Sequence, residues 1–452
     1  MGRLVFLGLD GVGLDLAQAL AARGVMPHLG ELMAQGRAWA TDSPLPEVSP
    51  VCWTTMFSGA NPGQHGVFGF GHHKPGSYAV SPVDSNAVRA PRLWERLSRA
   101  GRRSVVLNVP LTYPATAING VMVSGFVAPE LSRATHPPAL LPRLEALGYR
   151  PEADLDKGRE DPAALALDVG RALETRLAMF RELWREDWEL FCAVITDSDR
   201  INHFLWPALW EPEHPLAEAA LAIYRQIDGF IGELWRELRP AVQSGETAFL
   251  IAADHAFGPI RSEVYLNPWL MERGYLMVEG PAGAERILPQ SRALALDPGR
   301  IYLHYAGRFP QGRLHPGPEA EALCREIASQ LSELTYRQIA RTGDGLSVAT
   351  ARPVAQVHGR DELYQGPHAL EGPDLVAQAA PGFSLRAGLG RGAVFGLSHL
   401  TGTHRPQGAL ALWLGQGLGD DLPCDISGLY GLMSSWLGLE NCLDLLHGTG
   451  SR

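Results

Sequence analysis

The chain has 452 residues and exceeds the usual size of a domain built around a single hydrophobic core. One large domain with an insertion, or two lobes, is therefore expected. Its 46% hydrophobic and 19% charged residues are typical of a globular protein, and its net charge of −10 argues against nonspecific binding to nucleic acids or anionic membranes. The five cysteines are scattered and form no CxxC pair, which argues against a disulfide framework and a thiolate zinc site.

Short apolar runs and amphipathic segments alternate along most of the chain. Strands are predicted at residues 3–9, 104–109, 121–126, 189–196, 247–253 and 409–414. Helices are predicted at 14–35, with a break near Gly24–Pro27, and at 50–58, 90–100, 162–185, 215–238, 318–334 and 426–438. This alternation predicts an α/β fold with a largely parallel sheet covered on both faces.

The region from about 260 to 395 breaks this alternation. It is rich in glycine, proline and arginine, and we expect it to contain an insertion or cap within one catalytic domain spanning 1–452. No apolar run is long enough to cross a bilayer, and the N-terminal residues lack the long apolar stretch of a signal peptide. We therefore expect a cytoplasmic protein that has neither a membrane nor a nucleic-acid polymer as its partner.

Four short segments carry acidic and histidine residues with metal-binding chemistry. They are LGLDG at 7–11, TDSDRINHF at 196–204, AADHAFG at 252–258 and GTHRPQG at 402–408, and they supply Asp10, Asp199, His203, Asp254, His255 and His404. Several of these residues directly follow predicted strands, and ligands of open α/β sheets bind at the carboxyl ends of strands. Six such ligands, with the Ser49 hydroxyl, suit two divalent cations and a nucleophile.

The spacing of these residues indicates how they are placed. Asp199 and His203 are four residues apart and share one face if the segment opens a helix. Asp254 and His255 are adjacent, which suits a sharp turn, and His404 lies in a turn-rich segment. Any one of these residues alone would be interpreted as a surface or capping group. The prediction of a metal site therefore depends on their occurring together.

Ser49 precedes Pro50 in the segment EVSPVCWTTMFSG, at or near the N-cap of a predicted helix. A serine cap worth ~1 kcal/mol is the simplest interpretation. A helix N-terminus also suits a phosphate or an alkoxide, and a metal ion would make the hydroxyl a usable nucleophile. Cys52, the nearby thiol, is better interpreted as a small buried packing residue.

The order Asp, hydroxyl, Asp-x3-His, Asp-His, His resembles the alkaline phosphatase superfamily. The sequence is most similar to the type I phosphodiesterase/nucleotide pyrophosphatase branch and its bacterial relatives described as predicted phosphohydrolases or phosphomutases. The likeness covers nearly the whole chain and includes the segments LGLDG, SPVCWTTMFSGANPGQHGVFGF, TDSDRINHFLW, AADHAFGP, GPDLV and GTHRPQG. It implies an alkaline phosphatase-like three-layer α/β/α sandwich with an inserted cap.

The resemblance also implies a division of the ligands between two ions. One ion would be held by Asp199, His203 and His404, and the other by Asp10, Asp254, His255 and the Ser49 oxygen. Such sites suit Zn²⁺, with Mn²⁺ as the alternative. Ser49 stands where relatives often carry threonine, and it would attack phosphorus to give a phosphoserine intermediate. Thr54 and Thr55 are nearby alternatives that would lie inside the helix.

The substrate implied is a small-molecule phosphate ester, either a diester or a monoester. No arginine adjoins Ser49, and Arg200, Arg405 and Lys74 are candidates for a phosphate clamp only by their proximity to motifs. This favours a monoanionic diester over a dianionic monoester. Two alternatives stay open: a phosphomutase or phosphotransferase using the same site, and a catalytically inactive, metal-stabilised binding protein.

Overall fold

The computed structural model describes residues 2–281, 283–342 and 345–439, which group into two compact units. The first unit comprises the chain up to Asn61, Asp84–Phe257 and the chain from His404 onward, and the second comprises Pro62–Val83 and Gly258–Thr403. The expected insertion at about 260–395 falls within the second unit, and its role as a cap remains a proposal. Four cysteines are described and are free, whereas Cys442 lies outside the described residues.

The first unit is built on an eight-stranded sheet. Its order is β2-β22-β9-β1-β8-β5-β6-β7, and β9, β1, β8, β5 and β6 run parallel to one another. The strands are β1 (Arg3–Leu9), β2 (Arg37–Thr41), β5 (Ser104–Leu107), β6 (Gly120–Val123), β7 (Thr135–His136), β8 (Leu190–Ile195), β9 (Thr247–Ala252) and β22 (Ala409–Leu414). The predicted α/β fold with a largely parallel sheet is therefore confirmed.

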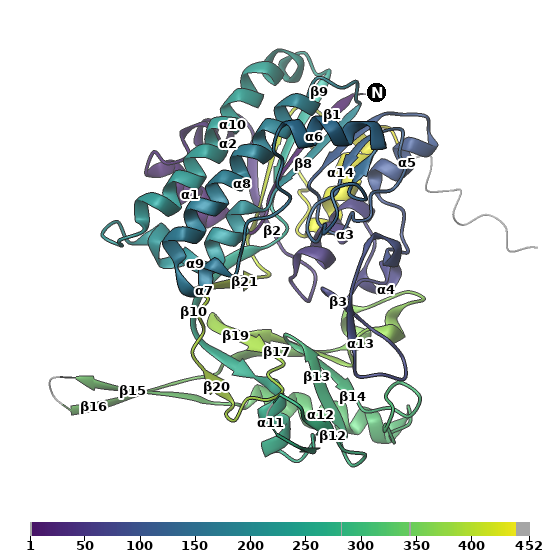
Figure 1. Ribbon diagram of the computed structural model, residues 1–452, viewed down its shortest axis with the longest axis vertical. Coiled ribbons are helices and arrows are strands. Elements are labelled where there is room, and N and C mark those ends of the chain that lie inside the picture. The colour runs from purple at the N-terminus through teal and green to yellow at the C-terminus, as the bar shows by residue number, and fades with distance from the viewer. Residues whose placement is uncertain (1, 282, 343–344, 440–452) are drawn as a thin grey trace, which may run out of the picture. The chain divides into compact units, whose positions relative to one another are not determined.

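Helices cover both faces of this sheet, which makes three layers (Figure 1). On one face lie α3 (Ser49–Ser58), α5 (Leu93–Arg99) and α14 (Ile426–Trp436), whose apolar side chains form one core cluster with alternate strand residues. On the other face lie α1 (Leu14–Ala22), α2 (Pro27–Gln35), α8 (Pro162–Leu183), α9 (Asp197–Trp210) and α10 (Ala217–Gln243). The short helices α6 (Leu141–Ala146) and α7 (Lys157–Glu160) complete the unit.

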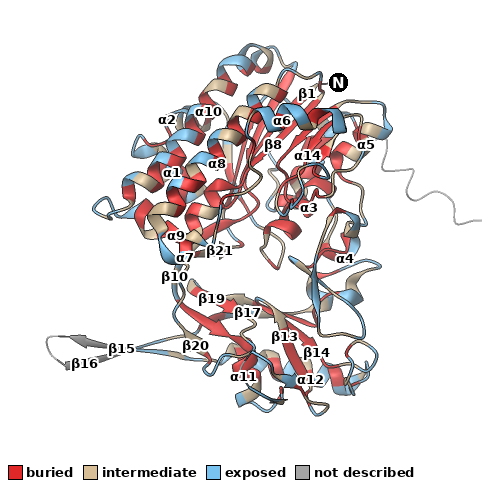
Figure 2. Cartoon of the chain, viewed as in Figure 1, coloured by how far each residue is buried: buried red, intermediate tan, exposed pale blue. Residues whose placement is uncertain are grey.

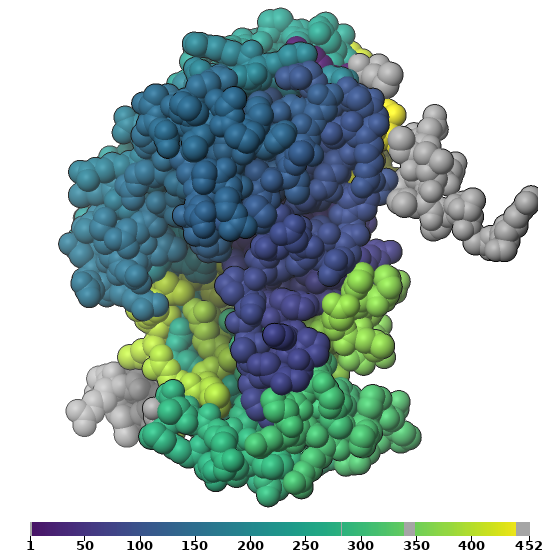
Figure 3. Space-filling view, turned by 45° about the vertical axis from the view of Figure 1, so that its right-hand side comes forward, coloured from purple at the N-terminus to yellow at the C-terminus, as the bar shows by residue number. Residues whose placement is uncertain are grey.

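Burial on both faces explains why the strands read as continuous apolar runs. Every residue of β8, β9 and β22 is buried, and the sheet appears as a buried layer between helices in Figure 2. In the space-filling view, residues from the first half of the chain form most of the visible surface of this unit (Figure 3). No described helix is both long and apolar enough to cross a membrane.

The sheet departs from the sequence predictions at its edges. β22 is antiparallel to both of its neighbours, and the edge strands β2 and β7 were not predicted. β5 ends at Leu107, two residues early, because Asn108 adopts a left-handed backbone with φ of 58°. The predicted break in residues 14–35 is confirmed, since α1 and α2 are separate helices.

The second unit consists of short strands and helices around its own apolar core. One sheet has the order β13-β14-β18-β17, and another places β10 between β19 and β20 and pairs it with β21. The strands are β3 (Gly71–His73), β4 (Val80–Pro82), β10 (Ala256–Tyr265), β11 (Val278–Glu279), β12 (Arg286–Ile287), β13 (Ala293–Asp297), β14 (Arg300–Leu303), β15 (Tyr336–Thr342), β16 (Gly345–Ala351), β17 (Val354–Gly359), β18 (Leu375–Ala379), β19 (Gly382–Arg386), β20 (Phe395–Gly396) and β21 (Gly402–Arg405). The first two residues of β10 and the last two of β21 belong to the first unit. The helices are α4 (Pro62–His65), α11 (Leu266–Glu272), α12 (Pro318–Ser332) and α13 (Arg360–Leu363).

Candidate metal centre

The register of the three central strands brings acidic residues to one edge of the sheet. Leu9 at the end of β1 lies opposite Ile195 of β8, and Gly8 lies opposite Ala252 of β9. Asp10 follows β1 directly, Asp199 lies in the first turn of the helix after β8, and Asp254 comes two residues after β9. Because parallel strands end at the same edge, residues separated by more than 200 positions meet there.

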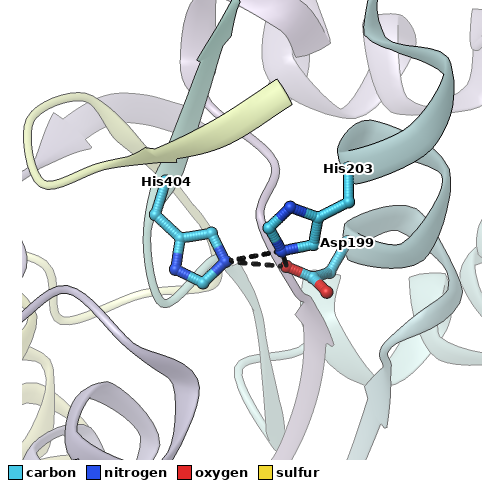
Figure 4. Close-up of side chains that lie close together, drawn as sticks. All are labelled: Asp199, His203 and His404. Atoms are coloured by element: carbon cyan, nitrogen blue, oxygen red, sulfur yellow. Dashed lines mark hydrogen bonds and ion pairs between the residues drawn. The ribbon is translucent and has the colours of Figure 1, made fainter. Parts of the chain in front are cut away.

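Asp199, His203 and His404 form the first cluster (Figure 4). The Asp199 Oδ1 atom lies 3.2 Å from His404 Nε2 and 3.5 Å from His203 Nε2, and the two imidazole nitrogens are 3.0 Å apart. Asp199 and His203 come from one face of α9, as their spacing predicted, and His404 comes from β21. The three atoms converge as the ligands of a single ion would.

Asp10, Asp254 and His255 form the second cluster, and all three are buried. His255 Nε2 lies 3.3 Å from Asp254 Oδ2 and 3.6 Å from Asp10 Oδ1. It also lies 4.0 Å from Asp199 Oδ1, so the two clusters adjoin. The structure thus brings all six predicted carboxylate and histidine residues together in two groups of three.

The chemistry of these groups fits cations. Asp199 Oδ1, Asp254 Oδ2 and His255 Nε2 are buried and make no hydrogen bond within the described part of the chain. Burial, together with Asp254 and Asp199, raises the pKa of Asp10, and burial with Asp199 raises the pKa of Asp254. Burial also lowers the pKa of His255, which favours the neutral imidazole that binds a metal. A divalent ion in each group would offset the cost of burying these carboxylates.

Hydrogen bonds from outside the two clusters orient the ligand atoms. His404 Nδ1 lies 2.7 Å from the Glu47 carbonyl oxygen. When Nδ1 donates its hydrogen to this carbonyl, the other ring nitrogen, Nε2, carries no hydrogen and faces the first cluster as a ligand atom. The Trp53 indole N–H donates to Asp10 Oδ2 at 3.0 Å, and the Gly11 amide donates to Asp254 Oδ1 at 3.2 Å. In both carboxylates one oxygen is held by a hydrogen bond and the other faces the cluster.

The turn that carries Asp10 is fixed by α9. Ser198 Oγ donates to the Asp10 carbonyl at 2.7 Å, and the Asn202 amide donates to the Gly11 carbonyl at 2.9 Å. Gly11 has φ of 72°, and a Cβ there would lie 2.7 Å from the Phe257 ring, so only glycine fits. Phe257 in turn packs against the rings of His203, His255 and His404.

Ser49 adjoins the second cluster. It is buried, and its Oγ donates to Asp10 Oδ1 at 3.4 Å. Val48 is the N-cap of α3 and Ser49 is the first helical residue, so the serine lies near the cap, as expected, but its side chain makes no capping bond. The alternatives Thr54 and Thr55 lie inside the helix, and Thr54 Oγ1 donates to the Pro50 carbonyl at 2.6 Å.

Cys52 lies within the apolar core cluster and is fully buried. Burial raises the pKa of its thiol well above the usual value, which disfavours a thiolate nucleophile. The packing role expected from the sequence agrees with this position.

The candidate phosphate-clamping cations have other partners. Arg200 Nη1 donates to Asp199 Oδ2 at 2.5 Å, and Arg405 Nη2 donates to Asp15 Oδ2 at 2.7 Å. Lys74 belongs to the second unit. Sequence reasoning missed Trp53 and the Glu47 carbonyl. Trp53 is four residues from Ser49 on the same helix, and that spacing could have indicated it, but no sequence signal identifies a carbonyl contact 357 positions away.

The chain is similar to known proteins in sequence and in fold. A sequence model of the family "Type I phosphodiesterase / nucleotide pyrophosphatase" matches residues 4–404. A crystal structure of phosphonoacetate hydrolase from Sinorhizobium meliloti 1021, in complex with phosphonoformate, is 17% identical, with 96% of each chain covered and a TM-score of 0.62. No curated protein matches the chain.

A second group of similar structures is mammalian. Murine ectonucleotide pyrophosphatase / phosphodiesterase 5, as an inactive variant in complex with AMP, is 13% identical, with 97% of this chain and 96% of that chain covered and a TM-score of 0.56. The human protein is 15% identical, with 96% and 95% covered and a TM-score of 0.56. At such identities the likeness shows a shared fold.

Proposed function

The chain belongs to the type I phosphodiesterase / nucleotide pyrophosphatase family, and from this premise we propose that it hydrolyses phosphodiesters with two metal ions and a Ser49 nucleophile. Membership makes it a hydrolase of phosphoester bonds. The observation that carries the finer proposal is the Ser49 hydroxyl, 3.4 Å from a carboxylate of one ligand trio, with the second trio adjoining.

The protein's own residues would divide the work as follows. Asp199, His203 and His404 would hold one ion, and Asp10, Asp254 and His255 the other. When bound, the ions would polarise the ester oxygens and neutralise charge that develops during displacement. Ser49 would attack phosphorus in line with the leaving alcohol, which gives a serine-linked phosphodiester that keeps the second ester group, and water would then release the phosphate monoester and restore the hydroxyl.

Trp53 and Glu47 would keep this geometry. The indole N–H holds one oxygen of Asp10, and the Glu47 carbonyl fixes the ring of His404, so both ligands are oriented before the substrate arrives. Glu47 and Ser49 are two residues apart, so the same short segment carries the nucleophile and orients a ligand of the first cluster. Zn²⁺ suits these mixed nitrogen and carboxylate sites, with Mn²⁺ as the alternative.

A diester is the favoured substrate. A dianionic monoester needs more positive charge around its free oxygens than a monoanionic diester does. Within the first unit, Arg200 and Arg405 are both engaged by carboxylates. One similar structure is a phosphonoacetate hydrolase and another binds AMP, so phosphonates and nucleotides belong among the substrates to be compared.

A substrate panel tests the proposal. Bis(4-nitrophenyl) phosphate, 4-nitrophenyl phosphate, a dinucleotide and phosphonoacetate would be compared with Zn²⁺, with Mn²⁺ and with chelator. We expect metal-dependent turnover, fastest for a diester, and a 4-nitrophenyl phosphoryl group on the Ser49 peptide when turnover of bis(4-nitrophenyl) phosphate is quenched with acid. A consistent preference for monoesters would contradict the diester assignment, and no turnover of any compound would favour the inactive binding protein.

The same assay addresses the phosphotransferase alternative. With an added alcohol acceptor and a diester substrate, a transferase would form a new phosphate ester of that alcohol in proportion to the acceptor, whereas a hydrolase would release mainly the phosphate monoester. We expect the second result.

A further inference from the structure

Arg200 lies beside the first cluster but belongs to neither group of ligands. It is in the first turn of α9, and only 11% of its side chain is exposed. Its guanidinium makes contacts on several sides. Nη1 donates to Asp199 Oδ2 at 2.5 Å, Nε and Nη2 donate to Glu152 Oε2 at 3.3 and 3.4 Å, and the group lies 4.5 Å from the centre of the Phe126 ring.

The two oxygens of the Asp199 carboxylate have different neighbours. Oδ2 accepts from Arg200, whereas Oδ1 faces His404 and His203 at 3.2 and 3.5 Å. Oδ1 is also the oxygen that is buried without a hydrogen bond within the described residues. An arginine on one oxygen therefore leaves the other as the single atom directed at the cluster.

We propose that Arg200 is a positioning residue that holds Asp199 as a one-oxygen ligand of the first metal ion, and that Glu152 and Phe126 hold Arg200 in turn. The inference rests on the proposed metal centre and adds a determinant of metal affinity to it. Three of the five N–H donors of the guanidinium are used in this arrangement, one on each nitrogen. A phosphate clamp would direct a pair of donors at the substrate, for which one N–H on each of Nη1 and Nη2 is left, so the test below includes this alternative.

The planar shape of arginine is essential to this role. One side chain reaches Glu152 and Asp199 together and stacks on an aromatic ring, which requires a flat group with donors in fixed directions. Lysine keeps the charge but has a single, freely rotating ammonium group. Arg200→Lys therefore separates the geometric contribution from the electrostatic one.

The test measures binding of Zn²⁺ alone to metal-free protein. Residues that orient metal ligands typically contribute about 10- to 100-fold to metal affinity. We expect Arg200→Lys to weaken one of two Zn²⁺ sites by about that range and to leave the other unchanged. Glu152→Gln, at a side chain that is 23% exposed, should weaken the same site by less. The double variant should lose less affinity than the two separate losses combined, because both act through one contact.

Arg225→Lys is the matched control. Arg225 forms a 2.5 Å ion pair with Glu218 on α10, and both side chains are well exposed, so its change should leave both Zn²⁺ affinities as in the wild type. At saturating Zn²⁺, the KM of Arg200→Lys for a diester should stay near the wild-type value, while kcat recovers as the site fills.

The outcomes separate this inference from the proposed function. If wild-type protein binds two Zn²⁺ ions, and both Arg200→Lys and Glu152→Gln bind them with unchanged affinity, the positioning role is refuted. A raised KM with unchanged Zn²⁺ affinity would also refute it and identify Arg200 as a phosphate clamp. If wild-type protein binds no Zn²⁺ or Mn²⁺, the proposed metal centre itself fails. Because Glu152 is partly exposed and Glu152→Gln leaves the arginine side chain in place, this variant tests the inference even if Arg200→Lys does not fold.

Discussion

Replacing Ser49 with alanine should abolish turnover and leave the fold and the metal sites intact. The structure sets the scale of each effect. Ser49 makes no capping bond, and its hydrogen bond to Asp10 is long at 3.4 Å, so the free energy of unfolding should fall by less than about 1 kcal/mol. The melting temperature should fall by no more than about 3 °C. Turnover should fall by at least about 10³-fold, since the attacking oxygen is gone.

Asp254→Ala should give the opposite pattern. Asp254 is fully buried, and its Oδ2 faces His255 at 3.3 Å. Its loss removes a charged ligand and leaves the Gly11 amide without its acceptor. Zn²⁺ at 100 times its dissociation constant should stabilise a site by about 2.7 kcal/mol. This stabilisation should persist in Ser49→Ala and disappear for one site in Asp254→Ala.

The assay compares turnover, bound Zn²⁺ and melting temperature in three variants. Ser58→Ala is the control, since Ser58 is a buried serine of the same helix whose hydroxyl donates to the Thr54 carbonyl. It should lose about 1 kcal/mol of stability and no activity. Near-normal turnover by Ser49→Ala would refute the reasoning, because the nucleophile would then have to be a water molecule.

Three further predictions concern metal content, ligand orientation and pH. Metal analysis of protein purified without chelator should find two divalent ions per chain; activity should be lost with chelator and restored by Zn²⁺ or Mn²⁺, and a reconstituted stoichiometry of one would exclude the two-metal mechanism. Trp53→Phe removes the indole N–H on Asp10 while keeping an aromatic ring, so calorimetry should show one Zn²⁺ site weakened by about 10-fold and the other unchanged. A hydrogen-bonded ion pair with Arg150 holds the pKa of Asp168 below its usual value, so this pair stabilises the fold above about pH 4 and its contribution is lost as the pH falls further. Asp168→Asn should therefore lower the melting temperature at pH 7, and the difference from the wild type should shrink towards about pH 2; a constant difference would contradict this assignment.

Much of the first unit could be predicted because its strands are buried on both faces. β8 and β9 are continuous apolar runs, and a run of that kind has few interpretations other than a buried strand. The edge strand β2, RAWAT, has only two buried residues out of five, so its composition differs little from that of a loop. The second unit is built of short strands, many of two to five residues, in which the period-2 pattern is too brief to identify.

The candidate site also contains features that could be predicted from the sequence and features that could not. The ligand residues are chemically distinctive and stand beside strand ends, so their convergence followed from the fold. The contact of Arg200 with Glu152 did not, because Glu152 lies 48 positions away and neither residue forms a motif with the other. Proximity to Asp199 in the sequence made Arg200 a candidate clamp by position alone, and the structure shows its hydrogen bond to the Asp199 carboxylate.

The position of β22 in the sheet has a consequence for biosynthesis. β22 lies between β2 and β9, so residues 37–41 have no strand to pair with in this sheet until the ribosome has made residues 409–414. His404, five residues before β22, arrives at the same late stage. Long-range pairing of this kind slows folding and leaves strand edges exposed during synthesis. A nascent chain stopped before Ala409 therefore lacks β22 and also leaves residues 37–41 without a partner strand in this sheet. We expect chaperones that bind unpaired β-strands to bind such a chain.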